Sequence, residues 1–85
     1  MSRAVICSAV RTPIGKFLGG LSELSPADLG VAAVTPALER AGVPADRVGE
    51  LRFGCGRQAG GGPNVARQIS VRSGIPVTST AVTVN

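Results

Sequence analysis

The stretch NVARQISVRSGIPVTSTAVTVN, residues 64–85, predicts a short helix followed directly by a strand. Asn64 comes after a proline and can cap the helix, which we expect to run to about Ser73. Apolar residues at helical spacing give it one inward face, formed by Val65, Ala66 and Ile69. The chain therefore changes here from helical periodicity to a strand.

The end of this helix has a stronger signal than its start. Gly74 suits the left-handed position after a helix, the apolar Ile75 follows it, and Pro76 prevents the helix from continuing. This order is that of a Schellman motif. Residues 78–84, rich in Thr and Val, then predict a strand.

A longer helix is expected upstream, from Ser25 to about Ala41. Ser25 can cap it, Pro26 fits its first turn, and Asp28 lies at the positive end of its dipole. Gly42 suits the position that ends it.

The apolar residues of this helix predict one buried face. Its members are Leu29, Ala32, Ala33, Pro36 and Ala37, widened by Leu38 and Ala41. Pro36 removes one backbone hydrogen bond inside the helix, and we expect a kink there rather than two helices.

Two further segments predict strands. AVICSAV, residues 4–10, is continuously apolar, as a central strand covered on both faces would be, and we interpret Cys7 within it as a small buried hydrophobe. Residues 48–56, VGELRFGCG, alternate between two faces, and the apolar face is formed by Leu51, Phe53 and Cys55.

The resulting order is β-α-β-α-β, an α/β fold with a largely parallel sheet. Right-handed crossovers make the three strands parallel, and such sheets bind ligands at the carboxyl ends of their strands. Here those ends are the long loop 11–24, the loop 56–63 and whatever follows Asn85.

Composition excludes several classes of site. The chain of 85 residues is 44% hydrophobic, carries a net charge of +4 and has no histidine. Every acidic residue lies in the first fifty positions, and no acidic residue follows to balance the later arginines, which are Arg52, Arg57, Arg67 and Arg72. This cationic stretch indicates either an anionic partner such as nucleic acid or balancing acidic groups elsewhere. Without histidine, and without acidic residues after Glu50, neither acid-base catalysis nor a metal site can be assembled.

Two motifs are candidate sites. GCGRQA, residues 54–59, matches a dinucleotide-binding pattern after a strand, but more glycines follow instead of a helix, and the acidic residue for the ribose is absent. Cys55 lies among glycines at a strand end, yet no base is available to activate it, which favours a structural role. No apolar run is long enough to span a membrane, and no signal peptide is indicated. The two cysteines lie in different apolar segments without metal-ligand spacing, which favours a reduced, cytoplasmic setting.

In order and spacing, the sequence resembles the N-terminal part of a thiolase, the family of acetyl-CoA acetyltransferases and 3-ketoacyl-CoA thiolases. The resemblance covers residues 1–85, an incomplete N-terminal domain, and its most specific parts are Arg11-Thr12-Pro13 with Gly15 and Asn64-x-Ala66-Arg67-Gln68. The matching segments are ICSAVRTPIGKFLGG (6–20), ADLG (27–30), ALERAGV (37–43), GPNVARQISVRSGIP (62–76) and STAVTVN (79–85).

The resemblance implies thiolysis of 3-ketoacyl-CoA or Claisen condensation of two acyl-CoA molecules through a cysteine acyl-enzyme. In the family the nucleophilic cysteine follows the segment similar to TVN, so neither Cys7 nor Cys55 corresponds to it. No catalytic, cofactor-binding or metal-ligating residue is therefore assigned to this chain. The implied partners are the remainder of the thiolase chain or a complementing chain, acyl-CoA substrates and further subunits in a homodimer or homotetramer.

Alone, the 85 residues are expected to be inactive and poorly soluble, because their apolar faces lack partners. The rival hypothesis is a small basic module that binds nucleic acid or another anion, with Arg67 and Arg72 on a helix face.

Overall fold

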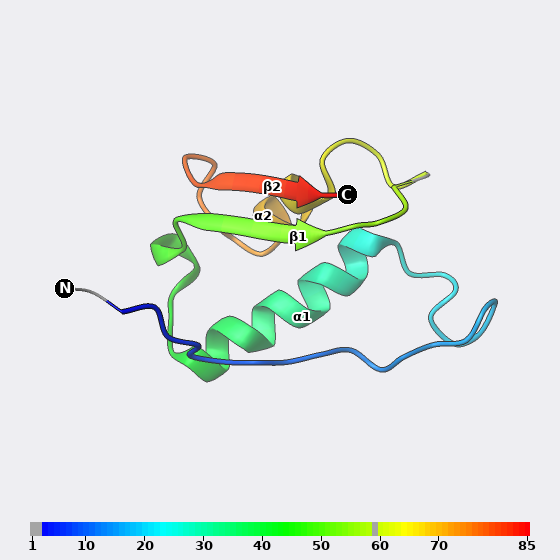
Figure 1. Ribbon diagram of the computed structural model, residues 1–85, viewed down its shortest axis with the longest axis horizontal. Coiled ribbons are helices and arrows are strands. Elements are labelled where there is room, and N and C mark those ends of the chain that lie inside the picture. Colours follow the sequence, from blue (N-terminus) through cyan, green and yellow to red (C-terminus); the bar gives the residue numbers. More distant parts are fainter. Residues whose placement is uncertain (1–2, 59) are drawn as a thin grey trace.

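The computed structural model describes residues 3–58 and 60–85. The elements, in chain order, are helix α1 (Pro26–Ala41), the short 3-10 helix η1 (Ala45–Arg47), strand β1 (Glu50–Gly54), helix α2 (Val65–Arg72) and strand β2 (Thr80–Val84). The strands form a parallel two-stranded sheet, and both helices lie on the same side of it (Figure 1). The α/β fold class is confirmed.

Helix α1 begins and ends where its caps are predicted. The Ser25 hydroxyl accepts a hydrogen bond from the Asp28 N–H, and the Asp28 carboxylate accepts one from the Ser25 N–H, so both halves of a capping box are present. Gly42 adopts a left-handed conformation with φ 70°, which ends the helix. The helix continues through Pro36, as expected for one helix rather than two.

The Schellman motif after α2 is confirmed. The Ile75 N–H donates to the Ser70 carbonyl at 2.9 Å, and the Gly74 N–H donates to the Val71 carbonyl at 3.2 Å. Gly74 has a φ of 80°, and Ile75 is buried. The chain can therefore reverse tightly and enter β2 parallel to β1.

A small core lies between the sheet and the two helices. Its buried members come from both helices and are Ala27, Val65 and Ile69. Leu51, Phe53 and Cys55 pack against them, which confirms the predicted inward face of β1. Val31 and Val34 complete the contact from α1.

The buried face of α1 differs from the prediction. Ala27 and Gly30 are its buried residues, whereas Ala32, assigned to the buried face, is exposed. A Cβ atom on Gly30 would lie 2.2 Å from Cδ1 of Ile69, so the missing side chain lets α2 approach at this point. The helix is turned toward this close contact, which a count of apolar side chains does not reveal.

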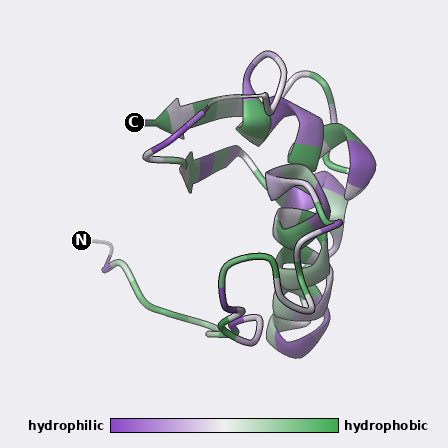
Figure 2. Cartoon of the chain, turned by 90° about the vertical axis from the view of Figure 1, so that its right-hand side faces the viewer, coloured by the Kyte–Doolittle hydropathy of each residue, from purple (hydrophilic) through white to green (hydrophobic). Residues whose placement is uncertain are grey.

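The predicted first strand, residues 4–10, is not formed, and Cys7 is exposed rather than buried. A strand needs a neighbour for its backbone groups. Among the described residues, segment 3–15 shares no backbone hydrogen bond with β1 or β2, which pair with each other. The segment runs along α1, apart from both strands (Figures 1 and 2), and Val5 and Ile6 within it are largely exposed.

Candidate functional site

The carboxyl ends of β1 and β2 form one edge of the sheet. Gly54 is in register with Val84, and the Cys55 N–H donates to the Val84 carbonyl at 2.8 Å, so the pairing extends to the last residues of both strands. The loop 56–63 leaves from this edge, and the start of α2 returns to it. This is the edge at which parallel sheets hold their ligands.

Asn64 fastens the start of α2 to this edge. Its backbone lies in the left-handed region with φ 24°, and its side chain forms three hydrogen bonds. Oδ1 accepts from the Arg67 N–H at 3.1 Å, which caps the helix as predicted, and from the Thr83 hydroxyl at 2.7 Å. Nδ2 donates to the Ala81 carbonyl at 3.2 Å.

Thr83 of β2 is the residue whose side chain is bonded to that of Asn64. Its Oγ1 donates to Asn64 and accepts from the N–H of the fully buried Ala66 at 2.9 Å. We call Asn64 and Thr83 the strand–helix clamp. Sequence reasoning recognised Asn64 only as a cap and missed Thr83, although a hydroxyl at an inward-facing strand position is the signal that could have found it.

The other polar residues of α2 hold the neighbouring loops. The Arg67 guanidinium donates to the Ser79 carbonyl at 2.8 Å, just before β2 begins. The Gln68 side-chain amide donates to the carbonyls of Gly61 and Pro63 at 2.8 and 2.7 Å. The Asn64-x-Ala66-Arg67-Gln68 motif thus fixes the position of β2 and of the loop before α2.

Cys55 lies at the same edge without a catalytic environment. It is half-buried, packs against the core, and its thiol donates to the Arg57 carbonyl at 3.4 Å. The described contacts are those of a structural residue, in agreement with the interpretation from sequence.

A groove of about 380 Å³ opens beside this edge, between α1, β1 and the chain around Arg11. Its lining is mostly apolar and includes Leu29, Ala33, Phe53 and Cys55, together with Arg11 and Thr12. Leu29 and Ala33, predicted to face the core, thus line a groove instead. Of the loop 11–24, only its first two residues reach the groove lining.

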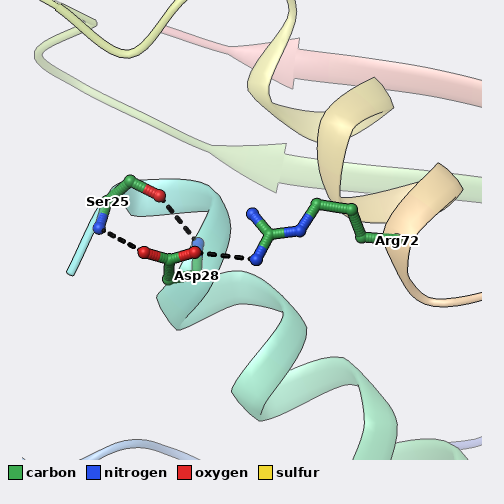
Figure 3. A network of polar contacts seen from close by, with 3 residues as sticks. All are labelled: Ser25, Asp28 and Arg72. Carbon is green, nitrogen blue, oxygen red and sulfur yellow. Dashed lines mark hydrogen bonds and ion pairs between the residues drawn. The ribbon is translucent and has the colours of Figure 1, made fainter.

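Two of the four arginines after Glu50, Arg52 and Arg72, form ion pairs within the chain. The Arg72 guanidinium lies 2.7 Å from the carboxylate of Asp28, which joins the end of α2 to the capping box of α1 (Figure 3). The Ser25 N–H and then Arg72 lower the pKa of Asp28. Arg52 lies 2.6 Å from Glu50 and, with the Thr80 hydroxyl, lowers the pKa of that carboxyl.

These pairs place two of the balancing acidic groups within the chain: Asp28 lies 44 residues from Arg72, and Glu50 lies two residues from Arg52. They also leave the rival hypothesis without support: Arg67 and Arg72 are engaged with α2's neighbours rather than presented together on a free face.

The dinucleotide pattern has no helix to complete it. α2 begins at Val65, well beyond Gly54, and the last residue of the pattern, Ala59, lies outside the described residues. Within 3–58 and 60–85, no three His, Cys, Asp or Glu residues are grouped as metal ligands would be. Over the same ranges, neither helix combines the length and apolar character needed to cross a membrane.

Comparison with known families decides between these interpretations. Residues 4–85 match the family described as thiolase, N-terminal domain. The chain belongs to the thiolase family. The resemblance identified from its motifs is thereby confirmed.

Curated relatives agree with this assignment. Acetyl-CoA acetyltransferase of Syntrophomonas wolfei is 46% identical over 81 residues, which are 95% of this chain and 20% of the relative. Acetyl-CoA acetyltransferase of Cupriavidus necator is 42% identical over 85 residues, 100% of this chain and 22% of the relative. This thiolase chain therefore spans about a fifth of the length of these relatives.

Solved structures show the same fold. Acat5 thiolase from Ascaris suum, solved in complex with coenzyme A, superposes with a TM-score of 0.92 at 45% identity, over 94% of this chain and 21% of that one. The acetyl-CoA acetyltransferase structure from Syntrophomonas wolfei gives 0.89 at 37% identity, over 93% and 20%.

Proposed function

We propose that this chain is part of a CoA-dependent acyltransferase that cleaves 3-ketoacyl-CoA by thiolysis or condenses two acyl-CoA molecules. The observation that carries the proposal is the parallel pair β1 and β2, whose paired carboxyl ends lie beside the start of α2, in a chain of the thiolase family. The named relatives are acetyl-CoA acetyltransferases, which supports the same chemistry.

In this proposal the chain supplies scaffold and site walls, and no residue of it touches the reacting atoms. The nucleophilic cysteine belongs to the segment that follows Asn85 in the complete enzyme, at the start of a helix whose dipole favours the thiolate. In condensation, that thiolate attacks the thioester carbonyl of one acyl-CoA, the new C–S bond forms as the C–S bond to CoA breaks, and CoA leaves as its thiolate and takes up a proton. A second cysteine of the complete enzyme takes the α-proton of a second acyl-CoA, and the resulting carbanion attacks the acyl-enzyme carbonyl and displaces the enzyme sulfur; thiolysis is the reverse.

β2 is the element that directs the chain into this site. Its last residues are held from one side by β1 and from the other by α2. The groove between α1 and β1 opens beside the same edge. We further propose that the complete enzyme works as a homodimer or homotetramer in the cytoplasm and that the 85 residues alone are inactive.

A graft tests the function. The 85 residues replace the aligned part of the Syntrophomonas wolfei acetyl-CoA acetyltransferase, and acetoacetyl-CoA thiolysis is measured in the purified graft. We expect activity with the kcat of the recipient enzyme reduced by no more than about tenfold. A folded graft without thiolysis would contradict the proposed function.

The isolated 85-residue chain is the matched comparison in the same assay. We expect no thiolysis from it, since the proposed nucleophile is absent. Turnover by this chain with no other protein present would overturn the proposed division of roles.

A further inference from the structure

We propose that the strand–helix clamp, Asn64 and Thr83, positions the end of β2 so that the segment after Asn85 enters the site in reactive geometry. The inference rests on the proposed function and deepens it by assigning two positioning residues. Neither residue touches substrate in this proposal; both act through the strand that leads to the nucleophile.

The location of the clamp is the first argument. The start of β2 is already held, because Arg67 donates to the Ser79 carbonyl and the Thr80 N–H donates to the Gly49 carbonyl. The clamp acts further along the strand, on Ala81 and, near the carboxyl end, on Thr83. Strands paired only by their backbones still twist relative to each other. A second attachment near the carboxyl end therefore sets the direction in which the chain leaves the sheet.

The hydrogen bonding of the clamp is the second argument. The Thr83 hydroxyl donates its only proton to Asn64 and accepts from the Ala66 N–H, so its rotamer is defined from both sides. The Asn64 side chain is likewise bonded through both its oxygen and its nitrogen. The first turn of α2 and the end of β2 are consequently joined by hydrogen bonds from both clamp residues.

The backbone of Asn64 is the third argument. A non-glycine residue with φ 24° is strained, and such strain persists where the surroundings over-determine the conformation, often at functional sites. At this residue the side chain reaches β2 through both its oxygen and its nitrogen. A simple helix cap needs only the bond from Arg67, so the two bonds to β2 call for a further role.

The test uses the active graft described above and the variant Thr83→Val, which removes the hydroxyl and keeps the branched shape. We expect kcat to fall by about tenfold to a hundredfold, as for other small misplacements of reacting groups, while KM changes by less than about twofold. Thr83→Ser retains the hydroxyl and should restore kcat to within about threefold of the parent graft. Thr80→Val is the matched control, since Thr80 lies on the outer face at the other end of β2 and should leave kcat unchanged.

A folded Thr83→Val graft with the kcat of the parent graft would overturn the inference. A Thr83→Ser graft with a kcat as low as that of Thr83→Val would also overturn it. The same holds for a Thr80→Val graft with an equally low kcat. If Thr83→Val cannot be purified in folded form, Asn64→Gly decides, because glycine accepts the left-handed backbone and removes all three side-chain bonds. The same loss of kcat supports the clamp, and parental kcat contradicts it. An inactive parent graft contradicts the proposed function itself, whereas an active parent with unaffected variants contradicts only the positioning role.

Discussion

Residues 3–24 and residues 25–85 are both rich in apolar side chains, yet only the second region forms helices, strands and a core. Ile6 and Phe17 are each 90% exposed, whereas Ile69 is completely buried. In the first region, the described backbone–backbone hydrogen bonds between its own residues are those of local turns at 16–24. Apolar content thus produces burial only where the backbone also finds partners.

The second region supplies those partners from its own sequence. Ser25 and Asn64 cap the helices, Gly42 and Gly74 end them, and β1 and β2 satisfy each other. Residues 3–24, by contrast, contain no helix cap, no residue that ends a helix and no paired strand. The same type of substitution should therefore change the stability of the fold by different amounts in the two regions.

The largest difference is expected for Ile69→Ala against Ile6→Ala in the isolated chain. Ile69 of α2 is buried in the core formed with α1 and the sheet, and its truncation should lower the free energy of unfolding by about 2–5 kcal/mol. Ile6→Ala should change it by less than about 0.5 kcal/mol. Urea denaturation followed by circular dichroism checks both.

Equal losses of unfolding free energy from the two isoleucine variants would show that segment 4–10 is packed in solution and would contradict the difference between the regions. The same two variants should also be measured in the active graft. A large loss for Ile6→Ala there, and not in the isolated chain, would mean that residues 4–10 obtain their strand partner only in the complete enzyme.

A smaller difference is expected for two glycines. Gly74→Ala forces a left-handed conformation on alanine and should lower the free energy of unfolding by about 1–2 kcal/mol. A Cβ there would lie 3.8 Å from that of Ala45, an ordinary contact, so the backbone is the cause. Gly20→Ala, with open space around it, should be neutral or stabilise by up to about 1 kcal/mol. Thermal unfolding of the two variants checks this prediction, and equal losses of stability would contradict the role of the Schellman motif.

The smallest effect is a pH dependence at the boundary of the two regions. The pKa of Asp28 is lowered in the folded chain, so its stabilisation is complete above the unfolded pKa of about 4 and is lost as pH falls through the folded value. Asp28→Asn should therefore flatten the decline of melting temperature below about pH 5. Asp46→Asn, at an exposed position, is the control, and an equally flattened decline in that variant would contradict the assignment.

Much of this fold was predictable because its signals are local. Ser25 with Asp28, Gly42 and the Gly74-Ile75-Pro76 sequence act within a few residues of themselves, and the structure places each as expected. The inward face of β1 followed from alternation alone. The signals that failed were non-local: the strand at 4–10 required a partner, and the face of α1 was decided by Ile69 at Gly30.

The candidate site was predictable only in outline. Parallel strands place their carboxyl ends together, and the sequence therefore located the edge next to Asn85. The clamp was not predictable, because Asn64 and Thr83 are separated in sequence and meet only when α2 lies on the sheet. The Asp28–Arg72 pair has the same cause.

By itself, then, the sequence determined where the two helices are capped and ended and the family to which the chain belongs, and it contains no histidine. Only the tertiary structure decided which face of α1 is buried, whether residues 4–10 form a strand and which side chains hold β2 in place. The physical reason is that caps and turns are satisfied by neighbours along the chain, whereas strand pairing, close packing and long-range hydrogen bonds depend on distant residues reaching the same place.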